Sequence, residues 1–102
     1  MSIKISFKAQ NKIIRFEIED KVVRYFDDIW QKGIQLYPMQ PEVVKKMINS
    51  RFPKISAAGL LIADANLEKN LEEYKSCNSE EDLAEMIRKD CLSKGLLEIK
   101  NG

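Results

Sequence analysis

The stretch IKISFKAQNKIIRFEIE, residues 3–19, decides the fold because its apolar residues predict two antiparallel strands. On each side of Gln10-Asn11, apolar residues recur at every second position, which is the spacing of a strand with one buried face. A loop centred on Gln10-Asn11 sets six apolar side chains opposite one another, as Ile3 with Ile18, Ile5 with Phe16, and Phe7 with Ile14. If the pairing shifted by one residue, all six side chains would point to solvent, so the register is well specified.

The composition is that of an ordinary soluble globular protein. With 102 residues, of which 44% are hydrophobic and 32% charged, the chain can bury one core, so we expect a single domain over residues 1–102. No apolar run approaches the roughly 18 residues that span a bilayer, so no membrane partner is expected. The chain starts directly with a strand and shows no basic and apolar leader. This predicts a cytoplasmic protein, or a mature chain whose leader was removed.

Helical spacing follows the hairpin. Apolar residues at positions 22, 23, 26, 29 and 30 predict an amphipathic helix over residues 21–32. Asp20 is a suitable N-cap for this helix, and Gly33 is suited to end it. Trp30 lies on the apolar stripe, so we expect it in the core rather than in an interface.

Two prolines delimit the next part of the chain. Residues 34–40 are predicted to form an apolar linker, because Pro38 keeps the residue before it out of helical geometry. A helix is predicted from Pro41, at its first position, to about Arg51, with Pro53 ending it.

The second half of the chain is predicted to be mainly helical. Residues 56–75 are expected to form either one helix or two helices broken near Asn66, and Gly59 indicates a close approach to another element. Asn78 or Ser79 caps a last helix, whose first turn carries three carboxylates where the helix dipole favours them. The sequence therefore predicts an α+β fold: an N-terminal antiparallel hairpin, extended in one alternative by a C-terminal strand at residues 97–99, packed against three to five helices.

The residue types exclude many enzyme classes. The chain has no histidine, so the usual general base, the common metal ligand and the Ser-His and Cys-His nucleophile pairs are all missing. Its four glycines are too scattered to cradle a phosphate. Cys77 and Cys91 are isolated, which favours reduced structural thiols over a disulfide or a metal site. We expect no catalytic residue, no cofactor and no metal site.

The charges are distributed unevenly along the chain. Residues 1–54 carry eleven Lys and Arg against six Asp and Glu, a net charge of +5, whereas residues 55–102 carry six against ten, a net charge of −4. Basic residues of the first part could attract phosphates or an acidic protein: Lys8, Lys12, Arg15 and Arg51. The competing interpretation is that these are ordinary charged side chains on solvent-exposed strand edges and helix faces, with no binding role. Tyr37 and Met39, in the proline-flanked linker, are candidates for a protein interface.

These observations favour a small non-enzymatic protein-protein interaction or regulatory module, which acts on another protein or on a copy of itself. The alternative is a nucleic-acid-associated accessory protein that uses the basic N-terminal half. Against this alternative, RNA modules built on strands present aromatic residues on an exposed sheet face, whereas Phe7 and Phe16 are predicted on the core face. An enzyme is the third interpretation, without a residue to name as catalytic.

Overall fold

A computed structural model describes residues 2–100 of the chain, and the N-terminal hairpin has the register that the sequence predicts. Strands β1 (Ile3–Ala9) and β2 (Lys12–Glu19) are joined by a two-residue turn at Gln10 and Asn11. Of the six side chains predicted to share one face, four are buried, and Ile3 and Phe16 are half-buried against the core. The prediction that this face is the core face is therefore confirmed.

The predicted helix over residues 21–32 is wrong. The chain instead forms strand β3 (Val22–Phe26), which pairs with β2 in antiparallel register. Asp20 and Lys21 make a two-residue turn with φ of +52° and +62°, the positive angles of a type I′ hairpin, so Asp20 does not cap a helix. The register turns Val23 and Tyr25 to the core face and the residues between and beside them to the other face. The helical spacing arose because apolar residues occur on both faces of this strand.

The predicted linker over residues 34–40 is also wrong in part. Residues Ile34–Tyr37 form strand β4, which pairs with β3, and Ile34 and Leu36 are buried. Gly33 has a φ of +82° and lies against the ring of Phe26, so it closes the loop between two strands rather than a helix.

A fifth strand completes the sheet. Strand β5 (Leu97–Ile99) pairs with β1, which confirms the alternative with a C-terminal strand. The sheet has the order β4-β3-β2-β1-β5, and all its pairings are antiparallel. The predicted α+β class is confirmed, but the sheet has two strands more than the hairpin and its C-terminal addition.

Four helices separate β4 from β5: α1 (Pro41–Ile48), α2 (Pro53–Ala65), α3 (Glu68–Ser76) and α4 (Glu80–Ser93). Pro53 begins α2, three residues before the predicted start. The break predicted near Asn66 is confirmed, and the Asn66 amide donates hydrogen bonds to backbone carbonyls of Leu36 and Ile62, which ties the end of α2 to β4. Ser79 caps α4 as predicted, because its hydroxyl accepts from the Asp82 N–H at 3.2 Å.

Gly59 has the close contact that the sequence indicates. A Cβ at this position would lie 2.9 Å from the Met47 Cβ and 2.9 Å from the Ile48 backbone nitrogen, so glycine lets α1 and α2 approach. Because α1 packs on α2 in this way, the two helices form one unit.

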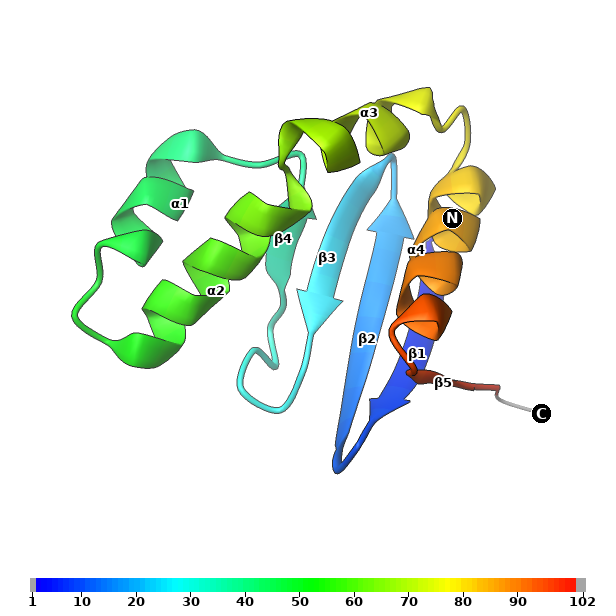
Figure 1. Ribbon diagram of the computed structural model, residues 1–102, viewed down its shortest axis with the longest axis horizontal. Helices are drawn as coiled ribbons and strands as arrows, with labels where there is room; N and C mark the ends of the chain where they lie inside the picture. Colours follow the sequence, from blue (N-terminus) through cyan, green and yellow to red (C-terminus); the bar gives the residue numbers. More distant parts are fainter. Residues whose placement is uncertain (1, 101–102) are drawn as a thin grey trace.

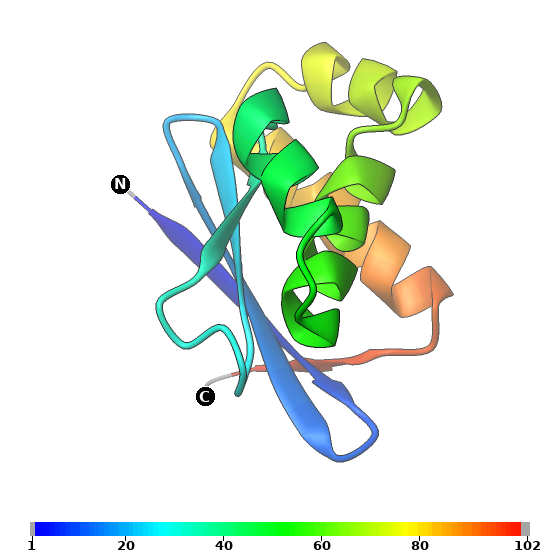
Figure 2. The ribbon, with the colours of Figure 1, turned by 90° about the vertical axis from the view of Figure 1, so that its left-hand side faces the viewer.

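All four helices lie on one side of the sheet (Figures 1 and 2). Helix α4 packs on β1, β2 and β5, and α2 packs on β4. The core lies between these two layers, and its most completely buried side chains are Phe7, Ile18, Val23 and Leu83. No helix of residues 2–100 covers the opposite side of the sheet, which we call the open face (Figure 2). Within the same residues no helix is long and apolar enough to cross a membrane.

Candidate functional site

The open face carries a row of apolar and basic side chains that crosses three strands. Cross-strand pairing sets Lys8 of β1 between Ile13 of β2 and Leu97 of β5. Ile13 is 61% exposed and Leu97 is 68% exposed. The solvent-exposed face of an antiparallel sheet is usually polar, so two aliphatic side chains at such exposure in one row depart from the ordinary pattern.

The next row across the sheet contains an aromatic ring held by arginine. It runs from Ile99 through Ser6 and Arg15 to Phe26. The Arg15 guanidinium lies 4.2 Å from the centre of the Phe26 ring, while its Nε donates to the Glu17 carboxylate at 2.9 Å. This geometry is a cation-π contact and fixes both side chains.

These two rows form one surface, which we call the open-face patch: Lys8, Ile13, Arg15, Phe26, Leu97 and Ile99. A hollow of about 330 Å³ lies within it, lined by residues of the patch together with Ser6, Asp27 and Gln31. Arg24 approaches the Phe26 ring from the neighbouring row, at 5.9 Å from its centre, and also donates to the Lys32 carbonyl at 3.1 Å.

The charges on the open face are mainly basic. By the strand register, four basic side chains point to this face against two acidic ones: Lys4, Lys8, Arg15 and Arg24 against Glu17 and Glu19. The pairing predicted from opposite charges, Lys4 across from Glu17, is present. The open face therefore combines an apolar patch with a positive surrounding.

Asp27 holds the loop that borders the patch. Its carboxylate accepts from the Tyr25 hydroxyl at 2.9 Å and from the N–H groups of Ile29 and Trp30 at 2.9 and 2.8 Å. Burial by itself would raise the pKa of Asp27, but the three hydrogen bonds and the charge of Lys12 together lower the pKa below its ordinary value. Burial, and then the bond to Asp27, raise the pKa of Tyr25. The loop is therefore an ordered support, and Asp27 is not a free acid.

The structure brings together only some of the residues that the sequence singled out. Lys8 and Arg15 lie in the open-face patch, and Lys12 lies exposed at the hairpin turn, opposite Ala9. Arg51 lies elsewhere, in the turn between α1 and α2, with its guanidinium 5.1 Å from the Phe52 ring.

Tyr37 and Met39, which the sequence suggested for a protein interface, pack against the core. Tyr37 is half-buried and its ring stacks on that of Tyr74, with centres 4.6 Å apart. Met39 and Trp30 are half-buried against the core, as predicted for Trp30. The apolar members of the open-face patch were missed. The sequence carries a signal for Ile13 alone, because the adjacent pair Ile13-Ile14 cannot bury both side chains on one face of a strand.

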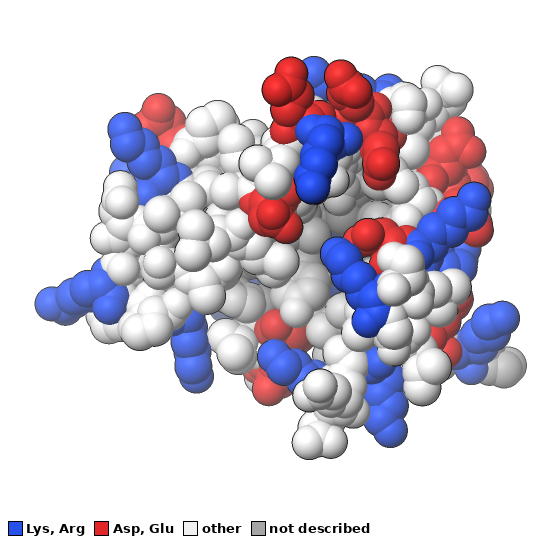
Figure 3. Space-filling view, in the orientation of Figure 1, with Lys and Arg blue, Asp and Glu red and all other residues white. Residues whose placement is uncertain are grey.

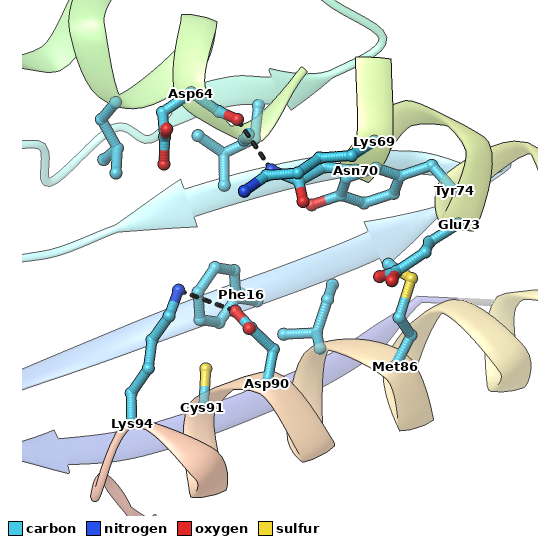
Figure 4. Close-up of a pocket in the computed structure, with 14 residues that line it drawn as sticks. Phe16, Asp64, Lys69, Asn70, Glu73, Tyr74, Met86, Asp90, Cys91 and Lys94 are labelled. Carbon is cyan, nitrogen blue, oxygen red and sulfur yellow. Dashed lines mark hydrogen bonds and ion pairs between the residues drawn. The ribbon is translucent and has the colours of Figure 1, made fainter. Parts of the chain in front are cut away.

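A second concave site lies on the helical side, between α2 and α3 on one side and α4 on the other (Figure 4). This cleft has a volume of about 390 Å³, and Phe16 and Leu36 of the sheet are among its lining residues. Charged side chains surround it, as Figures 3 and 4 show, and Lys94 pairs with Asp90 across 2.9 Å.

The cleft has no activated nucleophile among the groups whose pKa is shifted. Burial, followed by the charge of Asp90, raises the pKa of Tyr74 to about 12 and that of Cys91 to about 11. Both groups are therefore protonated near neutral pH, when neither is a strong nucleophile. Among residues 2–100, no three His, Cys, Asp or Glu residues are grouped so that they could hold a metal ion.

No protein-family model matches the chain, and no curated protein or solved structure shows significant similarity to it. The two sites are therefore weighed by their own chemistry. In the open-face patch Ile13 and Leu97 are 61% and 68% exposed, whereas most apolar lining residues of the cleft are buried or half-buried and the most exposed of them, Leu61, is 43% exposed. The open-face patch is the stronger candidate for a binding surface.

Proposed function

We propose that the protein is a non-enzymatic interaction module that binds another protein through the open-face patch. The observation that carries this proposal is the row in which Lys8 lies between the exposed side chains of Ile13 and Leu97. Covering these aliphatic side chains removes apolar surface from water, which is the main favourable contribution to protein association. Contiguous exposed apolar patches with polar borders are typical of interaction sites.

The charges on the open face indicate the chemistry of the partner. Four basic side chains against two acidic ones favour a partner whose own patch is apolar with carboxylates around it. Arginine and aromatic residues are enriched among the side chains that contribute most to binding. Because Arg15 already stacks on Phe26, these two side chains lose little freedom when a partner covers them.

The chemistry of the cleft supports a binding role rather than catalysis. Tyr74 and Cys91 supply the hydroxyl and thiol groups of the cleft, and burial raises the pKa of each far above neutrality. The chain also lacks histidine, which most often supplies the general base that would activate them.

Site-specific photo-crosslinking in the source cells tests this proposal. A benzoylphenylalanine placed at Ile13 should give one or a few discrete adducts with other proteins, because this side chain would lie inside the interface. The same group at Glu72, exposed on α3 on the helical side, is the matched control and should not give these adducts. Equal adducts from both positions, adducts of twice the chain mass alone, or no adduct from Ile13 would contradict the proposal.

A pair of leucine substitutions adds a test of binding strength. Leu97→Asp places a carboxylate in the open-face patch, on the edge strand β5, and should abolish the Ile13 adducts. Leu92→Asp makes the same change at a leucine that is 49% exposed on α4, and the adducts should persist. Loss of the adducts in both variants would indicate a general effect on the chain rather than a local interface.

A second candidate function is binding of single-stranded nucleic acid. The observation that favours it is Phe26, which points to the open face between Arg15 and Arg24. Strand-based RNA modules stack bases on such rings, and basic side chains follow the backbone. We place it second because the row offers a single aromatic ring, whereas those modules stack two or three bases.

Fluorescence anisotropy with a labelled oligouridylate separates the two candidates. Nucleic-acid binding would weaken steeply with added salt, and Phe26→Ala would weaken it roughly five- to a hundredfold, the usual loss of one stacked base. Lys69→Ala, at an exposed lysine on α3 on the helical side, is the control and should have little effect. Absence of binding at low salt would remove this candidate.

A further inference from the structure

Helix α2 is apolar on its outer side as well as on its inner side. Ala58, Gly59 and Ile62 face inward and are buried, yet Leu60 and Leu61 on the other side are 55% and 43% exposed. A surface helix normally carries polar residues on its outer side, whereas a helix that is apolar all round is normally covered. Figure 3, which views the helical side, shows a broad area without charged side chains over α1 and α2.

The two charged residues of α2 lie at opposite ends of this exposed stripe. Lys54 is in the first turn and Asp64 in the last turn, and with Ala57 and Leu61 they are spaced by three, four and three residues, which places them on one side of a helix. All four are exposed. Lys54 and Asp64 take part in none of the four ion pairs found among residues 2–100.

Each of these charges is unfavourable for α2 taken alone. The helix dipole favours acidic residues near the N-terminus and basic residues near the C-terminus. Helix α2 has no acidic residue in its first turn and no basic residue in its last turn. An antiparallel neighbouring helix would make both charges favourable. Its C-terminus would lie beside Lys54 and its N-terminus beside Asp64.

We propose that two copies of this chain associate through the exposed side of α2, with the two helices antiparallel about a two-fold axis that crosses them at the level of residue 59. In this register Lys54 of each copy faces Asp64 of the other, so the dimer contains the ion pair twice. The same register sets Ala57 opposite Leu61 of the second copy, a small side chain against a large one, and brings Leu60 close to the axis. The contact is isologous and closes at two copies.

This second surface is separate from the open-face patch. Helix α2 lies on the helical side of the sheet, and the open-face patch lies on the opposite side (Figure 2). The dimer therefore leaves two open-face patches free, and it neither depends on the proposed partner nor competes with it. Two linked patches would also bind a partner with two matching sites more strongly than one patch does.

Sedimentation velocity tests the association in the full chain. From roughly 1 µM to 1 mM, the range of weak to moderate homodimers, the mass should rise from one copy to two copies and no further. Leu60→Asp should keep the chain monomeric throughout, whereas Leu92→Asp, at a leucine of similar exposure on α4, should dimerise like the parent chain. A monomer at every concentration, or a dimer that survives Leu60→Asp, would overturn the proposal.

A charge exchange tests the antiparallel register itself. Lys54→Glu or Asp64→Lys alone should raise the dissociation constant roughly tenfold, because each removes two exposed ion pairs and introduces like charges. The double variant should recover most of the parent affinity, and failure to recover would exclude this register. Each single reversal corrects the charge against the dipole, so the thermal midpoint of the monomer should not fall, which separates weaker dimerisation from misfolding.

Discussion

The two faces of the sheet use the same strands for different purposes. Ile14 is buried beneath the helices, while its neighbour in sequence, Ile13, points the other way and is exposed in the open-face patch. On the covered face, side chains such as Phe7 and Ile18 are inaccessible to water. Apolar residues in these strands therefore fall into two classes, one that is buried in the core and one that is exposed to water.

The largest effect is expected on the covered face. Phe7→Ala should reduce the free energy of unfolding by about 3–5 kcal/mol, because it removes a fully buried ring and leaves a cavity. Lys8→Ala, at the next residue on the open face, should change it by less than about 0.5 kcal/mol. Urea unfolding measures both values, and a similar loss for the two variants would mean that the faces do not differ as described.

A smaller effect is expected in the helical layer above the covered face. Gly59→Ala should destabilise the protein by about 1–3 kcal/mol, because the added Cβ would lie 2.9 Å from atoms of α1. Helix propensity alone predicts the opposite sign, by up to about 1 kcal/mol. An increase in the urea midpoint would therefore show that α1 does not pack on α2 as closely as described.

A third prediction concerns the loop beside the open-face patch, and it depends on pH. Asp27→Ala should cost about 1 kcal/mol at pH 7, because the Asp27 carboxylate accepts three hydrogen bonds. The folded-state pKa of Asp27 lies below its ordinary value, so this contribution is present above the ordinary pKa and is lost as pH falls through the lowered one.

Unfolding free energies at pH 7 and in strong acid measure this dependence. The difference between the parent chain and Asp27→Ala should shrink in acid, while Asp28→Ala, at the exposed neighbour, should show little difference at either pH. A difference that does not vary with pH would contradict the assignment of these hydrogen bonds to the ionised carboxylate.

The same two classes of apolar residue explain what the sequence could predict. The hairpin register was predictable because apolar and polar residues alternate along both strands. Ile5, Phe7 and Phe16 lie on the covered face, and the polar residues beside them point to the open face. In β3, Val22 and Phe26 are apolar on the open face, so they fill positions that a simple strand pattern leaves polar and produce helical spacing. Phe26, which belongs to the open-face patch, is thus one of the residues that made this strand resemble a helix in the sequence.

The candidate site was only partly predictable for a related reason. Lys8 and Arg15 stand out by charge alone, but the open-face patch requires Leu97 to lie beside Lys8, at the other end of the chain. Sequence spacing does not show that neighbourhood, because it depends on β5 returning to pair with β1. The outward leucines of α2 were visible in the sequence, but which side of the helix the core covers became clear only from the packing of α1.

The apolar residues of the open-face patch are exposed and should not be needed for the fold, which the urea unfolding of one double variant can show. Ile13→Thr with Leu97→Thr places a β-branched side chain suited to strands at both positions while it removes much of the exposed apolar surface. The free energy of unfolding should change by less than about 1 kcal/mol, as expected for exposed positions. A loss of more than about 3 kcal/mol, the size expected for a buried side chain, would show instead that these residues belong to the folding core.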